Sequence, residues 1–329
     1  MTRSGCSECS LGHPHEAKAR LHEAKAHPHE ATRMIPIVSR TRIGMAAARA
    51  TMPSPVVLIP TMGALHDGHR ALLRHGRALA GPDGSLVVSV FVNPLQFGAG
   101  TDLDRYPRDL ARDVEICAAE GVSVVFAPLD SQMYPMEQTI TVNPGTVGRL
   151  LEGTFRPGFF EGVLTVVLKI FNLVQPDVAV FGQKDAQQVF LVRRMVADLN
   201  LNVDIASVAT VREPDGLALS SRNSYLSPAD RVTALALSRA LRAGAQAAPA
   251  GAQAVLAAAN AELAAAALKD PPLATDYLEL VDPQTFRPVA PAQADTPAQA
   301  DTHALLLVAG TVGKTRLIDN ALVTLRSAQ

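Results

Sequence analysis

The chain lacks the features that mark secreted, membrane-bound or nucleic-acid-binding proteins. It has three cysteines (Cys6, Cys9 and Cys117) in 329 residues, too few for a disulfide framework. No apolar run approaches the roughly 20 residues of a membrane span, and the N-terminus has no apolar core like that of a secretory signal. The 30 Lys and Arg residues nearly balance the 31 Asp and Glu residues, giving a net charge of −1. These absences predict a cytoplasmic protein that binds neither nucleic acid nor a membrane, so any anionic ligand must be held by a local cluster.

Residues 1–33 differ in composition from the rest of the chain. The tripeptide His-Glu-Ala recurs every seven residues between His15 and Ala31. The repeat has few large apolar residues to form a coiled-coil seam, so we expect a disordered, His-rich extension. The pair Cys6-x-x-Cys9, followed by histidines, suggests zinc as an alternative, but the usual ligand spacing is met only loosely.

From residue 34 onward, apolar runs of strand length alternate with longer segments of helical spacing. The runs are apolar on both faces, as expected for parallel strands covered by helices on both sides. The pattern therefore predicts an α/β domain over residues 34–210. Ligands of such sheets bind at the carboxyl ends of the strands. The expected strands are residues 55–59, 86–92, 122–127, 177–181 and 203–210, and the expected helices are residues 68–80, 108–120, 163–174 and 185–198.

The alternation of strands and helices changes after residue 210. Ser227-Pro228 is typical of a helix start, because serine accepts hydrogen bonds from free N–H groups and proline is tolerated in the first turn. Residues 211–329 are predicted to form a smaller α+β domain, in which the direct repeat of Pro-Ala-Gln-Ala-Asp-Thr is a solvent-exposed insert. The expected elements are a helix from residue 228, an Ala-rich helix at about 251–268, and short strands at about 275–281 and 304–309.

The string Pro60-Thr-Met-Gly-Ala-Leu-His-Asp-Gly-His69 follows the apolar run 56–59. This order predicts a buried strand that leads through a turn into the N-terminus of a helix. Such N-termini attract phosphate, because they present unpaired N–H groups and a partial positive charge. His66 and His69 add donors at the same place. A zinc pair is the alternative, although helical zinc pairs are more often spaced i, i+4 with an acid beside them. We favour phosphate, and Gly68 indicates the close approach of a ligand or of backbone.

Two further segments carry groups that suit an anion. Gly182-Gln-Lys184-Asp185 stands at the end of an expected strand, and a lysine beside glycine there is a common phosphate contact. Leu219-Ser-Ser-Arg222 combines two hydroxyls with a guanidinium. Taken alone, the first could be a solvated ion pair and the second a helix-capping turn. Together with the histidine string they predict a site for a triphosphate.

The segment Gly313-Lys314-Thr315 resembles the end of a Walker A loop. That motif requires a glycine six residues before the lysine, and this chain has Val308 there. We therefore interpret the segment as a strand and turn of the small domain.

Uncharged amides at two places suggest a second substrate. Asn93 and Gln96 follow an expected strand, and Gln187 and Gln188 follow Lys184 on an expected helix. Amides hold hydroxyls and carboxylates without adding a titrating group.

Other charged residues are less specific. Arg156 could add positive charge near the cleft, and four aspartates could either hold Mg²⁺ or form an ordinary acidic surface. These are Asp102, Asp104, Asp109 and Asp113.

Several of these strings together resemble the pantoate–β-alanine ligase (pantothenate synthetase) family. They are PTMGALHDGH, FVNPLQFG, DLDRYPR, GVLTVVLKIFNLVQPDVAVFGQKD, VREPDGLALSSRN and GKTRLIDN. The resemblance runs from about residue 36 to about residue 321, without the His-rich extension and the repeated insert. The family is similar to class I aminoacyl-tRNA synthetases in its Rossmann-like nucleotide fold, and HDGH and LSSR stand where those enzymes carry their ATP signatures.

The resemblance implies a two-step ligation in the cytoplasm, within pantothenate biosynthesis. The carboxylate of (R)-pantoate attacks the α-phosphorus of ATP to give pantoyl adenylate and pyrophosphate. The amine of β-alanine then attacks the acyl carbon and releases AMP and pantothenate. The resemblance also implies Mg²⁺ bound with the ATP, a homodimer, and a small C-terminal domain that closes over ATP. Such chemistry needs positioning and charge stabilisation rather than a covalent enzyme intermediate.

The resemblance assigns roles to particular residues. His69, His66, Lys184 and Arg222 are the candidates for catalysis; the family treats His69 as an acid, whereas we expect it to stabilise charge on the departing pyrophosphate. Gln96 and Gln188 are expected to hold pantoate, with Gln96 also facing β-alanine. The nucleotide site is expected to comprise Met62, Gly63, Ala64, Leu65, His66, Asp67, Gly68, His69, Gly182, Gln183, Lys184, Asp185, Val211, Leu219, Ser220, Ser221 and Arg222.

The chain departs from the family pattern at two positions beside these residues. Phe159 replaces a histidine, and Ala186 replaces a tyrosine that usually follows Lys-Asp. Two other functions stay open, of which only the second draws support from these two departures. A related nucleotidyltransferase would keep the phosphate elements but act on another acid, and a regulatory protein would bind a nucleotide without catalysis. Because the phosphate elements are intact, we expect activity.

Overall fold

The computed structural model of the chain describes residues 35–98, 103, 106–289 and 302–325. The extension with its Cys6-x-x-Cys9 pair, Asp102, Asp104 and most of the repeated insert lie outside these residues. Within the described residues, no helix is both long and apolar enough to cross a membrane.

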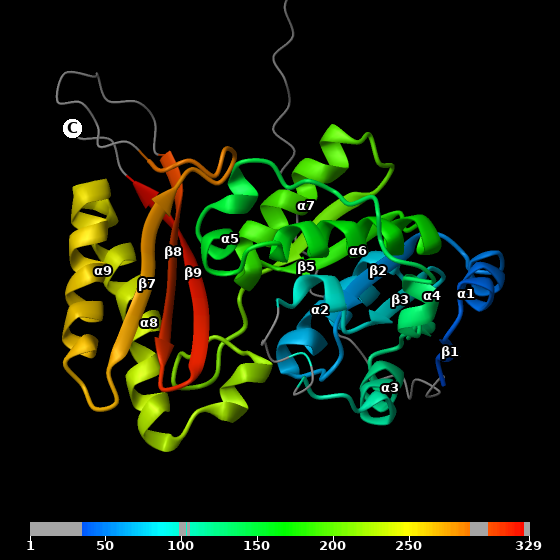
Figure 1. Ribbon diagram of the computed structural model, residues 1–329, viewed down its shortest axis with the longest axis horizontal. Helices are drawn as coiled ribbons and strands as arrows, with labels where there is room; N and C mark the ends of the chain where they lie inside the picture. Colours follow the sequence, from blue (N-terminus) through cyan, green and yellow to red (C-terminus); the bar gives the residue numbers. More distant parts are fainter. Residues whose placement is uncertain (1–34, 99–102, 104–105, 290–301, 326–329) are drawn as a thin grey trace, which may run out of the picture. The chain divides into compact units, whose positions relative to one another are not determined.

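The first part of the chain builds a six-stranded parallel sheet (Figure 1). The strands are rich in Val, Leu and Ile, and the central ones are buried on both faces, as expected for a sheet covered by helices on each side. This confirms the predicted Rossmann-like fold. Its strands are β1 (Ile37–Ser39), β2 (Val56–Thr61), β3 (Ser85–Val90), β4 (Val124–Phe126), β5 (Val178–Gly182) and β6 (Asp204–Val208), in the order β1-β4-β3-β2-β5-β6.

Helices pack on both faces of this sheet (Figure 1). One face is covered mainly by α1 (Arg42–Arg49), α6 (Phe159–Val174) and α7 (Ala186–Asp198), whose apolar residues form one core with Leu58 and Val87. The other face is covered by α2 (Asp67–Ala80) and α3 (Leu110–Ala119), which form a second core. Short helices α4 (Asp130–Met133) and α5 (Glu152–Phe155) lie in the connections.

The order of the strands places a ligand-binding edge next to β2. Strand β2 pairs in parallel with β3 on one side and with β5 on the other. The chain leaves β2 through α2 toward β3, and it leaves β5 through α7 toward β6, so the strand order diverges between β2 and β5. Such a switch point at the carboxyl ends of parallel strands is where α/β sheets bind ligands. The histidine string follows β2, and the turn with Lys184 follows β5.

The C-terminal part forms a three-stranded antiparallel sheet with two helices. It comprises α8 (Pro228–Ala247), α9 (Ala252–Ala267), β7 (Leu273–Val281), β8 (Thr302–Val312) and β9 (Thr315–Leu325), with β8 in the middle. Ser227 caps α8 in a capping box with Asp230, as expected for an N-terminal serine. The Gly-Lys-Thr segment forms the β8–β9 turn and the start of β9, which confirms that it is not a Walker A loop. The division predicted at residue 210 falls between the two sheets and stays a prediction.

A network of charged groups joins α5 to the C-terminal sheet. Arg316 on β9 donates to both carboxylate oxygens of Glu152 at 2.7 Å and to Asp276 at 2.7 Å. Tyr277 donates to Glu152 at 2.9 Å. Glu152 is 6% exposed, so these partners compensate a buried charge.

We expect Gly162→Ala to destabilise the junction between α6 and the turn that carries Gln96. A Cβ at residue 162 would lie 2.3 Å from the carbonyl oxygen of Leu95, so backbone would have to move. The free energy of unfolding should fall by about 1–3 kcal/mol, the usual cost of overpacking, which outweighs the better helix propensity of alanine. Urea unfolding measures this change. Gly182→Ala is the control, because nothing lies within 4 Å of its added Cβ; equal stabilities of the two variants would contradict the prediction.

Candidate active site

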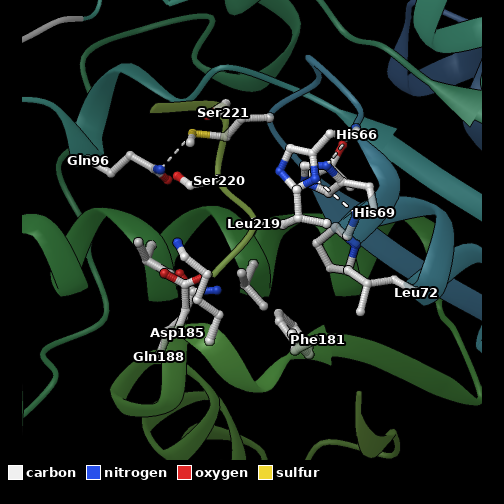
Figure 2. Close-up of a pocket in the computed structure, with 18 of the residues that line it drawn as sticks. His66, His69, Leu72, Gln96, Phe181, Asp185, Gln188, Leu219, Ser220 and Ser221 are labelled. Atoms are coloured by element: carbon white, nitrogen blue, oxygen red, sulfur yellow. Dashed lines mark hydrogen bonds between the residues drawn. The ribbon is translucent and has the colours of Figure 1, made fainter. Parts of the chain in front are cut away.

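A cavity of ≈ 230 Å³ opens at the carboxyl ends of β2 and β5. Figure 2 shows His66 and His69 on one side of it and Gln96 across from them. The three predicted phosphate-binding segments meet here. The predicted site residues that line the cavity are Met62, His66, Gly68, His69, Gln96, Gly182, Lys184, Asp185, Gln188, Val211, Leu219, Ser220, Ser221 and Arg222.

The two imidazoles cap the N-terminus of α2 and thereby acquire a defined tautomer. Nδ1 of His66 accepts from the N–H of Gly68 at 3.1 Å, and Nδ1 of His69 accepts from the N–H of His66 at 3.2 Å. Since each Nδ1 is an acceptor, the proton of each neutral ring resides on Nε2. A side chain at residue 68 would come within 2.8 Å of the His66 ring, so glycine is required by that ring.

Both imidazoles are held neutral near pH 7. Burial lowers the pKa of His69 to about 3, helped by the neighbouring His66 and Lys184. Burial also lowers the pKa of His66, and Lys184 adds to the effect. The rings are therefore neutral N–H donors in the free protein.

A buried carboxylate shapes the turn between β2 and α2. Gly63 and Ala64 both have left-handed φ angles, 83° and 52°. Asp113 on α3 accepts from the N–H of Ala64 at 3.0 Å and of Leu65 at 2.8 Å, which holds this turn in place. Burial raises the pKa of Asp113, and the two N–H donors oppose that rise.

Five residues of the predicted nucleotide site do not line the cavity, and their part in binding stays a prediction. Ala64 and Leu65 give their N–H groups to Asp113 rather than to the cavity, and neither they nor Gly63, Asp67 or Gln183 line it. Asp113 itself supports the backbone of this turn. Asp109 caps α3 through the N–H of Arg112. The described residues contain no group of three or more His, Cys, Asp or Glu side chains that could hold a metal ion.

A hairpin supplies the third phosphate-binding segment. The N–H of Leu219 donates to the carbonyl of Val211 at 2.9 Å, so both residues reach the cavity from paired backbone. Ser220 Oγ accepts from the N–H of Arg222 at 3.2 Å. Burial raises the pKa of Tyr106, and the neighbouring Ser221 opposes that rise. Tyr106 also lines the cavity and was not among the predicted site residues, although it lies in the motif DLDRYPR.

The amide of Gln96 is oriented by its neighbours. Its Oε1 accepts from Asn93 at 3.2 Å, and its Nε2 donates to the sulfur of Met62 at 2.8 Å (Figure 2). Asn93 is 1% exposed and in turn accepts from the hydroxyl of Tyr134 at 2.6 Å. Asn93 therefore positions Gln96 rather than lining the cavity.

The two glutamines of α7 have different roles. Gln188 lines the cavity. Gln187 does not: its Nε2 donates to the carbonyls of Val147 at 2.8 Å and Leu150 at 2.9 Å, and it supports that connection. Adjacent residues on a helix point in different directions, which the sequence interpretation of Gln187 overlooked.

One wall of the cavity is apolar. It comes from residues of α6 spaced three and four apart, together with Phe181 at the end of β5. That spacing indicates one helix face; the sequence alone could not tell whether it packs in the core or lines a site. The α6 residues are Phe159, Val163, Val166, Val167 and Ile170.

Arg156 brings a further cation to the cavity. Its guanidinium lies 3.5 Å from the centroid of the Phe159 ring and makes no ion pair with a described carboxylate. Burial, together with Arg222, lowers the pKa of Arg156 to about 10, so it stays charged at neutral pH. Phe159, the first departure from the family pattern, thus stacks on this arginine. Ala186, the second, is buried among Val281 and Phe286 of the C-terminal part.

Known proteins resemble this chain in sequence and in fold. The chain is 56% identical over 296 residues to pantothenate synthetase of Thermobifida fusca, an overlap of 88% of this chain and 96% of that protein. A crystal structure of pantothenate synthetase from Thermus thermophilus superposes with a TM-score of 0.76 at 44% identity, covering 87% and 98% of the two chains. The Francisella tularensis pantoate-beta-alanine ligase, solved in complex with beta-gamma ATP and beta-alanine, gives a TM-score of 0.68 at 30% identity, covering 87% and 97%.

The model of one protein family covers most of the chain. Residues 34–322 match the family described as pantoate-beta-alanine ligase. The match contains the six-stranded sheet, the C-terminal sheet except for the last three residues of β9, and every residue of the cavity. The chain therefore belongs to the pantoate-beta-alanine ligase family.

Proposed function

We propose that this protein joins (R)-pantoate to β-alanine in two steps driven by ATP. In the first, a carboxylate oxygen of pantoate attacks the α-phosphorus, the bond to the β-phosphate oxygen breaks, and pyrophosphate leaves. In the second, the amine of β-alanine attacks the acyl carbon of pantoyl adenylate, the bond to the AMP oxygen breaks, and the nitrogen loses a proton. The products are pantothenate and AMP.

One observation carries this proposal. A single cavity combines cations and neutral N–H donors at the end of β2 and β5 with amides and an apolar wall. The first set suits a triphosphate, and the second suits a small hydroxy acid. A site for either ligand alone would not need both.

The cationic side of the cavity fits the adenylation step. Lys184 and Arg222 approach from two different segments and would contact phosphate oxygens, Lys184 as a mobile point charge. Charge builds up on the leaving pyrophosphate as the bond to the α-phosphorus breaks. Fixed donors directed at that charge stabilise the transition state without reorganisation.

The two histidines would act as such donors. With a pKa of about 3, His69 is a neutral imidazole at neutral pH in the free protein. It therefore lacks the second ring proton that an imidazolium would give up as a general acid. Its Nε2–H, like that of His66, can instead donate to a phosphate oxygen. This supports charge stabilisation over proton transfer.

The opposite side of the cavity fits pantoate. Pantoate carries two hydroxyl groups and a quaternary carbon with two methyl groups. Gln96 and Gln188 offer amides to the hydroxyls, and the apolar face of α6 offers Val163, Val166 and Val167 to the methyl groups. The oriented amide of Gln96 would discriminate against acids that lack the hydroxyls.

Mg²⁺ would enter with the nucleotide. This ion keeps several waters and binds largely through substrate phosphates. Asp113 and Asp109 are engaged with backbone, which leaves Asp185 as the aspartate that lines the cavity and could contact the ion. The ion would offset negative charge on the triphosphate.

β-Alanine would reach the adenylate beside Gln96. Its carboxylate needs a cation, and Arg156 lines the same cavity without a carboxylate partner among the described residues. The complex of the Francisella tularensis relative with beta-gamma ATP and beta-alanine supports both substrates in this family.

Exchange of labelled pyrophosphate into ATP tests the first step. We expect exchange that depends on pantoate, because only pantoyl adenylate formation is reversible without β-alanine. Exchange with another acid but not with pantoate would indicate a related nucleotidyltransferase. A protein that binds ATP but exchanges with no acid would be a regulatory nucleotide-binding protein, and the proposal would be wrong.

The role of His69 can be separated from its role in capping α2. We expect His69→Asn to lower the exchange rate roughly 10²- to 10³-fold, the cost of losing one transition-state donor. Asparagine keeps an acceptor near the position of Nδ1 but has no donor near Nε2. His69→Gln restores a donor near Nε2 and should recover part of the rate, and His75→Ala, exposed on the same helix, should keep the full rate. A wild-type rate in His69→Asn would remove His69 from the mechanism.

The protonation state of His69 can be measured directly. Long-range ¹H–¹⁵N correlation spectra of the free protein should show the Nε2–H tautomer and no titration above pH 5. The unfolded chain takes up this proton below pH 6.5, whereas the folded protein resists until about pH 3. Folding stability should therefore fall as pH drops through this window, and less steeply in His69→Asn. Titration of His69 near pH 6.5 would contradict the assignment.

We further propose a homodimer, with β1 at the interface. Strand β1 is an edge of the six-stranded sheet, and Ile35, Ile37 and Ile43 around it are 86%, 59% and 84% exposed. Exposed apolar residues on an edge strand favour association. Sedimentation equilibrium should give twice 34.7 kDa. Ile43→Glu should shift the mass toward the monomer, whereas Leu268→Glu, 89% exposed after α9, should not. A wild-type monomer would contradict the proposal.

A further inference from the structure

We propose that Asp319 and Asn320, adjacent on β9, are positioning residues for the phosphate-binding side of the cavity. Asn320 holds the loop that brings Lys184 to the cavity. Asp319 holds the loop that brings Arg222 to the cavity. The inference rests on the proposed function of that site, because it assigns these residues an effect on adenylation.

Asn320 holds the turn that carries Lys184. Its Nδ2 donates to the carbonyls of Gln183 and Lys184, both at 2.9 Å. The turn is the 3₁₀ helix η4 (Gln183–Asp185), and no side chain caps its start. Asn320 is 5% exposed, so its amide has little competition from water. The two bonds fix the backbone from which the lysine extends.

Asp319 holds the hairpin that leads to Ser220 and Arg222. Arg212 donates to its two carboxylate oxygens at 2.6 and 2.9 Å and also to the carbonyl of Gly216 at 3.1 Å. Arg212 pairs with Ala218 across the hairpin. The carboxylate of Asp319 is almost fully buried, so the ion pair is shielded from solvent. It links β9 to both sides of the hairpin.

The two residues act on different loops because they lie on opposite faces of the sheet. Asp319 is paired with Val308, which packs with α8 and α9, and Asn320 is paired with Leu307, which packs with Ala186 at the start of α7. Successive residues of a strand point to opposite faces. One dipeptide therefore reaches the hairpin from one face and the Lys184 turn from the other.

A small second cavity lies between β9 and residues that line the main cavity. It has a volume of ≈ 30 Å³ and is lined by Asp319 and Asn320 on one side and by Lys184, Asp185 and Gln188 on the other. Neither Asp319 nor Asn320 lines the main cavity. A shift of β9 would reach that cavity through the two loops. A displacement of about 1 Å of a catalytic group can cost 10²-fold in rate.

The test is a double-mutant cycle with pantoate-dependent pyrophosphate exchange as the readout. Asn320→Ala should lower kcat roughly 10- to 100-fold. In the Lys184→Ala background the same substitution should change kcat less than about twofold, because a positioning residue has no effect once its group is absent. Asp319→Asn acts through the other loop and should lower kcat in both backgrounds. Asn320→Asp keeps the side-chain volume but places a carboxylate against two carbonyls, and it serves if the alanine variant does not fold.

Val323→Ala is the matched control. Val323 is 3% exposed on the same strand and packs in the C-terminal core, so its truncation lowers stability without touching either loop. It should keep the wild-type kcat per folded molecule. The inference is overturned if Asn320→Ala matches this control, or if its loss is as large without Lys184 as with it. A wild-type protein that shows no pantoate-dependent exchange would instead overturn the proposed function.

Discussion

The parallel pairing of β2 with both β3 and β5 is the constraint on which the site depends. It brings the carboxyl ends of β2 and β5 side by side, so segments more than 100 residues apart share one cavity. The turn after β2 delivers two imidazoles, and the turn after β5 delivers Lys184. Without this pairing each segment would be an ordinary turn, and the opening between them would have no phosphate-binding character.

The capping of α2 then determines the chemistry at that edge. The same Nδ1 atoms that satisfy the helix N–H groups leave the protons on Nε2, and burial keeps both rings neutral. A structural interaction thus sets the protonation state of the candidate catalytic groups. A charged imidazole would bind the triphosphate of the ground state more tightly. The hydrogen bond from a neutral donor strengthens most when negative charge develops on the leaving group in the transition state. An interaction that strengthens in the transition state raises kcat.

Local sequence patterns predicted the elements, and they failed where contacts are distant. The apolar runs located β2 to β6, because buried parallel strands are continuously apolar. Strand β1 has only three residues, two of them exposed, and left no such pattern. Asp113 was interpreted as a metal ligand or surface acid, since its partners at residues 64 and 65 lie 49 and 48 positions away. Nothing near Asn320 indicates contact with Lys184, which lies 136 positions away.

Two buried arginines show how the fold distinguishes a structural charge from one kept for a ligand. Burial alone would lower the pKa of Arg316, but hydrogen bonds to Glu152 and Asp276 outweigh it and raise that pKa. Arg156 makes no hydrogen-bonded ion pair with a described carboxylate. Burial and Arg222 lower its pKa to about 10, and the more distant charges of Glu152 and Asp185 oppose this only in part. The difference reflects the stronger interaction that Arg316 receives from carboxylates to which it is hydrogen-bonded. An anion in the cavity would supply such an interaction to Arg156, so binding of a carboxylate or phosphate relieves an unfavourable charge in the free protein.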